Sequence, residues 1–295
     1  MLLSQFIRQA ARSLEALYPP GEARSLVARL AEEVQGVKDY EAVLQPELEA
    51  APELEEGLSR LLCGEPLQYV TGVQEFYGRR FHVAPGVLIP RPETEILVRE
   101  ACMQALQLAG PRVLDLCTGS GCIAWSIALE VPGAQVTGVD ISPEALAIAR
   151  EQNPEFIFND EGPSSSFPAR PGISPVRFIQ ADVLGPLDEL PDQSFDILVA
   201  NPPYIRESER AAMHRNVLEH EPALALFVTD EDPLVFYRAI AGHARRLLAP
   251  GGWGMVEINE ALGKETAAVF REAGFEKIQI IPDYFGRDRF VNFIL

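Results

Sequence analysis

The sequence is short of positive charge. Its 295 residues include 25 Lys and Arg against 43 Asp and Glu, which gives a formal net charge of −18. Proteins that grip a phosphate backbone draw on clustered Lys and Arg, so this balance argues against direct binding of nucleic acid. It fits a protein partner with basic patches, and it also fits an acidic surface that serves only solubility.

Long apolar runs are also missing. No stretch approaches the roughly 18 to 20 uninterrupted apolar residues that a membrane-spanning helix needs. The first eight residues lack the layout of a signal peptide. We therefore expect a cytoplasmic protein that does not bind membranes. The hydrophobic content of 47% is ample for a core, and the length allows one large domain or two smaller ones.

Cysteine is scarce, and its four positions form no C-x-x-C pair: Cys63, Cys102, Cys117 and Cys122. Cys117 and Cys122 flank a glycine-containing loop, but no His or further Cys lies nearby in the sequence to complete a set of four zinc ligands. We therefore expect no metal site, and thiols that stay reduced and pack as small side chains.

The most informative motif that is present is Asn201-Pro202-Pro203-Tyr204, which follows an apolar strand expected over 195–200. An amide nitrogen is a poor nucleophile because its lone pair is delocalised. Carbonyl oxygens of the Asn201 side chain and the Pro202 backbone can accept both N–H bonds of a planar NH2 group, while Tyr204 packs on its flat face. The two prolines remove competing backbone donors. The motif therefore predicts methylation of a nitrogen, and the alternative is a strand end with a Pro-Pro turn.

A second motif predicts a nucleotide-like cofactor. Residues 113–116 and 136–140 read as strands around a loop in which Gly119 and Gly121 let the backbone approach a ligand closely. A helix that opens near Cys122 points its N–H groups at that ligand, and Asp140 can accept both hydroxyls of a ribose. Taken alone, the loop fits the G-x-G-x-x-A dinucleotide fingerprint, so an NAD-binding oxidoreductase is a rival interpretation.

Two features favour S-adenosylmethionine over a dinucleotide. Asp115 stands at the end of the first strand, where its negative charge would repel a pyrophosphate but not a sulfonium cofactor with an amino group. Asn201 ends a later strand, and ligands of open α/β sheets bind beyond the carboxyl ends of the strands. Cofactor and acceptor are therefore expected to meet in one crevice.

The sequence resembles the release-factor glutamine methyltransferases, which methylate the glutamine side chain in the Gly-Gly-Gln loop of peptide chain release factors. Asn-Pro-Pro-Tyr alone is shared with adenine-N6 DNA methyltransferases, whereas the segment 89–95, placed before the cofactor loop, is far more particular to this family. The resemblance covers most of the chain and is carried by residues 66–69, 72–76, 88–95, 115–121, 201–204, 221–222, 225–226 and 286–289.

The resemblance implies S-adenosyl-L-methionine as cofactor and a release factor as protein substrate. It places Asp182 at the adenine amine with Val183 on the ring, although a loop-capping role for Asp182 stays open. Arg91 is expected to shape the acceptor pocket or to form a salt bridge in a linker. The expected catalytic residues are Asn201, Pro202 and Tyr204; the acceptor site adds Pro203 and Arg91; and the cofactor site comprises Cys117, Thr118, Gly119, Ser120, Gly121, Asp140, Asp182, Val183 and Asn201.

Periodicity and resemblance together predict an α/β fold, a seven-stranded Rossmann-like methyltransferase sheet preceded by a small helical bundle and a β-hairpin linker. We expect the bundle at 1–72, where it docks the protein substrate, the hairpin at 73–91 and the catalytic domain at 92–295. The Pro-, Ser- and Gly-rich insertion at 154–172 is longer than its connection requires, and we expect it to be mobile.

We therefore expect a monomeric enzyme that moves a methyl group from S-adenosylmethionine to the side-chain amide nitrogen of that glutamine. Positioning is its main device, and a strong base is not needed. The alternatives are a ribosomal-protein glutamine methyltransferase, then an adenine-N6 nucleic-acid methyltransferase, and then the NAD-binding oxidoreductase.

Overall fold

The computed structural model describes residues 1–152 and 176–295, so the expected insertion at 154–172 lies outside the described residues. The chain divides into two compact units. The first comprises Met1–Val73, Val83–Pro85 and Met213–Glu221, and the second comprises Gln74–His82, Gly86–Ala212 and Pro222–Leu295. Among the described residues, no helix has the length and apolar character that crossing a bilayer requires.

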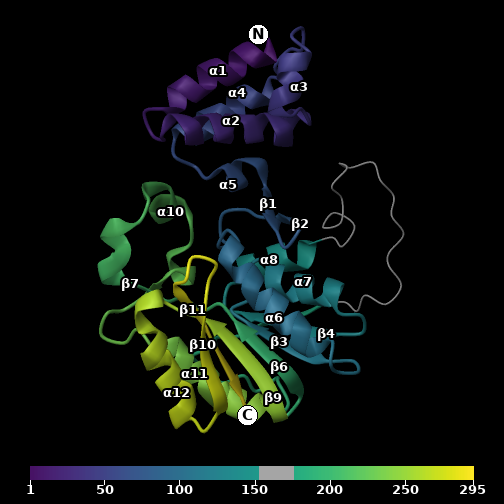
Figure 1. Cartoon of the computed structure of the whole chain (residues 1–295), viewed down its shortest axis with the longest axis vertical. Coiled ribbons are helices and arrows are strands. Elements are labelled where there is room, and N and C mark those ends of the chain that lie inside the picture. Colours follow the sequence, from purple (N-terminus) through teal and green to yellow (C-terminus); the bar gives the residue numbers. More distant parts are fainter. Residues whose placement is uncertain (153–175) are drawn as a thin grey trace. The chain divides into compact units, whose positions relative to one another are not determined.

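The first unit is a helical bundle (Figure 1). Proline at the first position starts its second helix, and Gly36, with a φ of 70°, ends it in the left-handed conformation. Gly57 lets two helices approach closely, since a Cβ there would lie 2.7 Å from Leu30 Cδ1. The helices of this unit are α1 (Leu3–Leu14), α2 (Pro20–Gln35), α3 (Asp39–Leu44), α4 (Glu53–Leu62), α5 (Leu67–Thr71) and α10 (Arg215–His220).

A β-hairpin follows the bundle in the sequence, as the pattern predicts. Its strands β1 (Val73–Phe76) and β2 (Arg79–His82) pair through a two-residue turn. Both turn residues have positive φ, 53° at Tyr77 and 67° at Gly78, which matches the twist that tight hairpins need.

The second unit is built on a seven-stranded sheet in the order β10-β11-β9-β6-β3-β4-β5 (Figure 1). The five strands from β9 to β5 run parallel, while β11 is antiparallel to both β9 and β10. The strands are β3 (Arg112–Leu116), β4 (Gln135–Asp140), β5 (Arg177–Gln180), β6 (Phe195–Ala200), β9 (Leu248–Glu257), β10 (Glu276–Pro282) and β11 (Asp288–Ile294).

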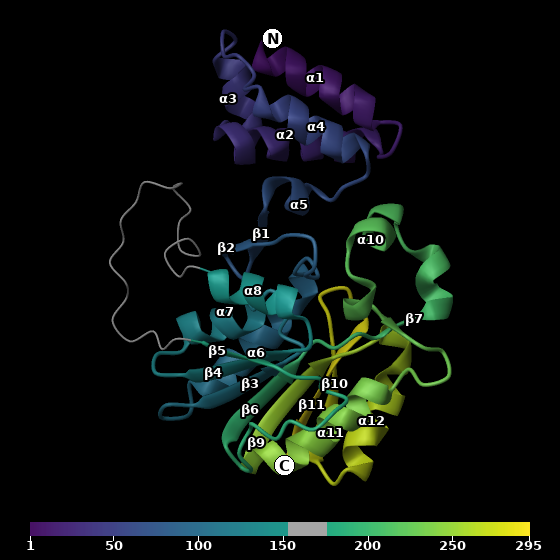
Figure 2. The same cartoon turned by 180° about the vertical axis from the view of Figure 1, so that it is seen from behind.

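Helices cover both faces of this sheet because its strands are apolar on both sides. In β6, Ile197 and Val199 face one core, while Leu198 and Ala200 face the other. The first core is covered by α6 (Glu95–Ala105) and α7 (Cys122–Glu130), with α8 (Pro143–Glu151) beside α7; the second is covered by α11 (Val235–Leu247) and α12 (Gly263–Glu272) (Figure 2).

The strand order reverses at β3, which has β4 on one side and β6 on the other. Crevices for ligands form at such a switch point, beyond the carboxyl ends of the strands. Short elements lie around this end of the sheet: η1 (Pro92–Thr94), β7 (Ile205–Arg206), η2 (Glu207–Ala212), η3 (Ala223–Ala225), β8 (Phe227–Val228) and η4 (Glu260–Leu262).

Candidate active site

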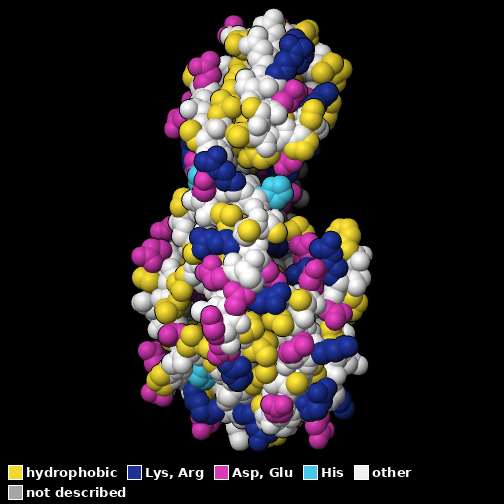
Figure 3. Space-filling model, turned by 90° about the vertical axis from the view of Figure 1, so that its left-hand side faces the viewer, with side chains coloured by type: hydrophobic (Ala, Val, Ile, Leu, Met, Phe, Trp, Pro, Cys, Tyr) yellow, Lys and Arg dark blue, Asp and Glu magenta, His cyan; other side chains and the backbone are white. Residues whose placement is uncertain are grey.

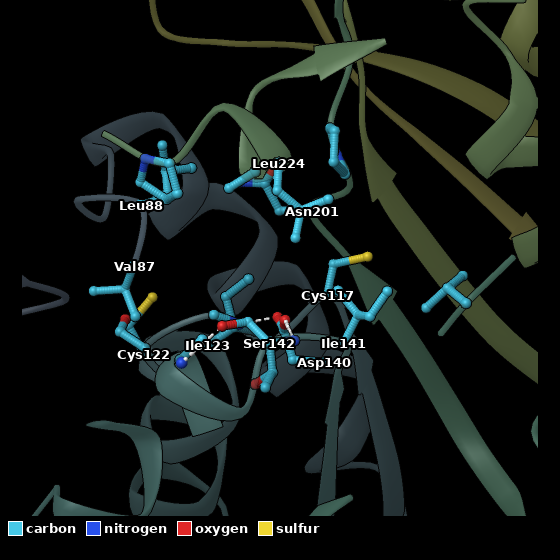
Figure 4. A pocket seen from close by; sticks show the side chains of 18 of the residues that line it. Val87, Leu88, Cys117, Cys122, Ile123, Asp140, Ile141, Ser142, Asn201 and Leu224 are labelled. Carbon is cyan, nitrogen blue, oxygen red and sulfur yellow. Dashed lines mark hydrogen bonds between the residues drawn. The ribbon is translucent and has the colours of Figure 1, made fainter. Parts of the chain in front are cut away.

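A cavity of about 320 Å³ lies at this carboxyl edge of the sheet (Figure 4). Its wall includes the loop after β3, the end of β4, the turn after β5, the first residues after β6 and the segment that leads into η1. The expected site residues that line it are Arg91, Cys117, Thr118, Gly119, Ser120, Asp140, Asp182, Val183, Asn201 and Pro203. The described lining does not include Gly121, Pro202 or Tyr204.

Asp140 shapes the loop that it faces. Its Oδ2 accepts a hydrogen bond from the Gly119 N–H at 2.8 Å, and its Oδ1 accepts one from the Ser142 N–H at 3.0 Å. Gly119 has a φ of 54°, in the left-handed region that favours glycine. Burial raises the pKa of Asp140, and the hydrogen bonds from Ser142 and Gly119 act in the opposite direction.

Gly121 packs against residues of neighbouring elements and is not part of the cavity lining that the structure describes. Its φ is 78°, and an added Cβ would lie 3.1 Å from atoms of Ala149, Phe178 and Trp125. A glycine at this position therefore lets the start of α7 pack closely against its neighbours. Cys117 also has a positive φ, 60°, although it carries a side chain, and it lines the cavity.

A second carboxylate lies below the loop. Asp115 is fully buried, and its Oδ2 accepts a hydrogen bond from the Thr118 hydroxyl at 2.6 Å. Its Oδ1 makes no hydrogen bond of normal geometry within the described residues. Burial raises the pKa of Asp115 to about 7, and the nearby Asp140 charge adds to the effect.

The carboxylates on the cavity wall suit S-adenosylmethionine better than a dinucleotide. Asp140 and Asp182 on the wall are acceptors for hydroxyl and amino groups, and Val183 and Ile141 offer apolar contact for a base. The Gly119 N–H, which a phosphate-binding loop would give to its ligand, is already held by Asp140. A pyrophosphate would therefore meet negative charge and a donor that is occupied.

The acceptor side of the cavity is organised by a chain of hydrogen bonds. Asn201 Nδ2 donates to Thr94 Oγ1 at 3.4 Å, and the Thr94 hydroxyl donates to Glu257 Oε2 at 2.7 Å. The Tyr204 hydroxyl donates to Glu257 Oε1 at 2.9 Å. Burial raises the pKa of Glu257, while the bonds from Thr94 and Tyr204 oppose that rise.

Thr94 and Glu257 are site residues that the sequence reasoning missed. Thr94 belongs to the segment 88–95, in which the sequence pattern points only to Arg91 as a site residue. Glu257 is the last residue of β9. Ligands of open α/β sheets bind beyond the carboxyl ends of the strands, and this rule, which points to Asp140 and Asn201, also points to Glu257.

The sheet and its cavity define a methyltransferase: a family model described as a methyltransferase domain matches residues 108–272, which is more than half of the chain. A release factor glutamine methyltransferase of Bacteroides thetaiotaomicron is 41% identical over 294 residues, covering 98% of each chain, and one of Flavobacterium psychrophilum is 36% identical over 299 residues, covering 99% of each. The chain therefore belongs to the release factor glutamine methyltransferase family, whose members use S-adenosylmethionine.

A solved protein-(glutamine-N5) methyltransferase from Alicyclobacillus acidocaldarius is also similar. It is 28% identical, with a TM-score of 0.42, and the match covers 72% of this chain and 98% of that one. The family assignment rests on the sequence relatives and excludes the NAD-binding oxidoreductase.

Proposed function

We propose that this chain methylates the side-chain amide nitrogen of the glutamine in the Gly-Gly-Gln motif of peptide chain release factors. The observation that carries the proposal is Asn201, which lines the cavity with its Nδ2 held by Thr94. Its Oδ1 has no hydrogen-bond partner among the described residues, so an acceptor oxygen is left for an NH2 group. The relatives named above support the release factor as substrate.

S-adenosylmethionine supplies an electrophilic methyl group on a sulfonium. The loop 117–121, Asp140, Asp182 and Val183 hold it, with Asp140 accepting from the ribose and Asp182 from the adenine amine. The Asn201 Oδ1 and the Pro202 carbonyl accept the two N–H bonds of the glutamine, which aims the nitrogen lone pair.

The other acceptor residues orient and shield the amide. Tyr204 packs on the flat face of the amide, Pro203 closes the turn, and Arg91 shapes the pocket. Positive charge that develops on the nitrogen is stabilised by the two carbonyl oxygens, and the proton leaves to water.

Asn201→Ala tests this assignment. Losing a charge-stabilising contact should cost about 2.7 to 4 kcal/mol of transition-state stabilisation, a fall of roughly 100- to 1,000-fold in kcat. Cofactor affinity should stay nearly intact, since the main lost contacts belong to the acceptor. The measurement is methyl transfer from radiolabelled S-adenosylmethionine to a purified release factor, with a factor whose Gly-Gly-Gln glutamine is replaced as control. A variant that retains a tenth of the wild-type turnover would refute the role of Asn201, and labelling of a ribosomal protein instead would refute the substrate.

The helical bundle, residues 1–72, is proposed to dock the release factor. The proposed hairpin linker then covers 73–91, and the proposed catalytic domain covers 92–295. Two observations support the docking role. The cavity lining lies in the second unit, and α3 of the first exposes the apolar side chains Tyr40, Val43 and Leu44, with exposed fractions of 60%, 68% and 75%. Such a cluster on a surface often marks a protein contact.

Replacing these three side chains by Ser tests the docking role. The variant should raise KM for an intact release factor several-fold and leave KM for a short Gly-Gly-Gln peptide unchanged, because the peptide has no surface for the bundle. A control variant replaces the exposed Met103 and Leu106 at the end of α6. Equal effects of the test variant on protein and peptide would contradict docking.

The proposal also places the enzyme in the cytoplasm as a monomer that binds no nucleic acid directly. The net charge of −18 supports the last point. On the face drawn in Figure 3, acidic side chains are interspersed among the basic ones. Light scattering during size-exclusion chromatography tests the monomer, for which 32.5 kDa is expected.

A further inference from the structure

A buried carboxylate lies level with the acceptor residue in the sheet. Strands β6 and β9 are parallel neighbours with Ala200 opposite Val256, so Asn201 and Glu257 follow at the same level. Glu257 is 1% exposed, and both of its carboxylate oxygens accept hydrogen bonds, one from Tyr204 and one from Thr94.

The Thr94 hydroxyl has a single proton, which it uses to donate a hydrogen bond to Glu257. A carboxylate that accepts from two hydroxyls has no proton to return, so Thr94 Oγ1 can only accept from Asn201. Asn201 must therefore turn its Nδ2 towards Thr94, where the distance is 3.4 Å. The reversed amide would set Oδ1 against Oγ1 with no proton between the two oxygens.

We propose that Thr94 and Glu257 are positioning residues for methyl transfer, which fix the Asn201 side-chain amide so that its Oδ1 faces the substrate NH2 group. This inference rests on the proposed role of Asn201. A site oriented in this way accepts from an amide NH2 and repels the carboxylate of a glutamate at the same position. Thr94 and Glu257 thus help to select the substrate group through the orientation of Asn201.

Thr94→Val tests the inference because it keeps the shape of the side chain and removes the hydroxyl. It should lower kcat roughly ten- to a hundredfold, since the Asn201 amide loses its fixed orientation. The dissociation constant for S-adenosylmethionine, measured by calorimetry, should change less than twofold. Thr94→Ser restores the hydroxyl and should recover most of the activity. The matched control is Thr266→Val, which removes a fully buried hydroxyl that has no hydrogen-bond partner in the described structure.

Glu257→Gln tests the direction of the hydrogen bonds. The glutamine keeps an acceptor for Tyr204 and places an NH2 group against Thr94, whose proton then turns towards Asn201. The Asn201 amide should reverse, and kcat should fall as far as in Thr94→Val although the side chains are nearly isosteric. Wild-type kcat in Thr94→Val, or equal losses in Thr94→Val and Thr94→Ser, would overturn the positioning role.

A double variant separates this inference from the function on which it rests. Thr94→Val should cause no further loss in an Asn201→Ala background, because both changes act through one amide. Independent, multiplicative losses would overturn the inference while Asn201 keeps its role. An active Asn201→Ala enzyme would instead overturn the proposed function itself.

Discussion

The buried Asp115 should make the second unit less stable as the pH rises. Its pKa is raised from 3.8 to about 7 by burial, so the folded state keeps a proton that the unfolded state loses near pH 4. Between these values the folded state binds more protons, and the free energy of unfolding therefore falls with increasing pH. The interval is about three pH units, and each unit corresponds to about 1.36 kcal/mol, which gives a ceiling of about 4 kcal/mol.

Asp115→Asn removes this titration and keeps an oxygen that can accept from Thr118. The stability gained over wild type should grow by about 3 kcal/mol between pH 5 and pH 8, because about two of the three units lie above pH 5. Urea unfolding without cofactor measures this gain. Tryptophan fluorescence is a suitable probe, because both tryptophans, Trp125 and Trp253, belong to the second unit. A difference between variant and wild type that stays constant from pH 5 to pH 8 would refute the reasoning.

Asp196→Asn is a control with the opposite sign. Arg112 donates to both oxygens of Asp196, and these bonds lower the pKa of that carboxyl. The ionised pair stabilises the fold above the ordinary aspartate pKa, and this contribution is lost as the pH falls through the lowered value. The variant should therefore be less stable than wild type at pH 7, with the difference shrinking in acid.

Two other predictions concern the loop and the thiols. Asp140→Ala should weaken S-adenosylmethionine binding by roughly 1.5 to 3 kcal/mol through lost charge-assisted hydrogen bonds, measured by calorimetry, and unchanged affinity would leave Asp140 a structural role only. A thiol reagent at pH 8 should label the exposed Cys63 first, because burial raises the pKa of Cys102 and Cys122 to about 12 and that of Cys117 well above its usual value. Mass spectrometry of the labelled peptides gives the order of labelling, and early labelling of Cys117 would contradict this prediction.

The sequence was sufficient to predict the sheet and much of the cavity wall. Parallel strands gather their carboxyl ends at one edge, so residues at strand ends lie close together in space although they are distant in the sequence. Asp140 and Asn201 were predicted on that basis and Asp182 from the family resemblance, and each of the three lines the cavity. Gly121, expected at the cofactor, is absent from the described lining, and the packing around its Cα accounts for the glycine.

Side-chain pairing across the fold could not be predicted in the same way. Thr94 and Glu257 are separated by 163 positions, and no local periodicity links a short helical turn to the end of β9. Tyr204 was expected at the acceptor site, and the residue that fixes its hydroxyl, Glu257, lies 53 positions away in the sequence. Such contacts depend on which elements the fold brings together and on how donors are satisfied once water is excluded.

The glycine loop shows why its motif alone left two cofactors open. The G-x-G-x-x-A spacing specifies a backbone shape, a tight turn into a helix, and that shape is present here. Whether the loop binds a negatively or a positively charged ligand depends on residues outside the glycine motif. Asp140 occupies the Gly119 N–H, and Asp115 lies beneath Thr118. With these donors engaged, the carboxylates on the cavity wall, Asp140 and Asp182, remain as acceptors, and the hydroxyl and amino groups of a sulfonium cofactor satisfy them where a pyrophosphate cannot.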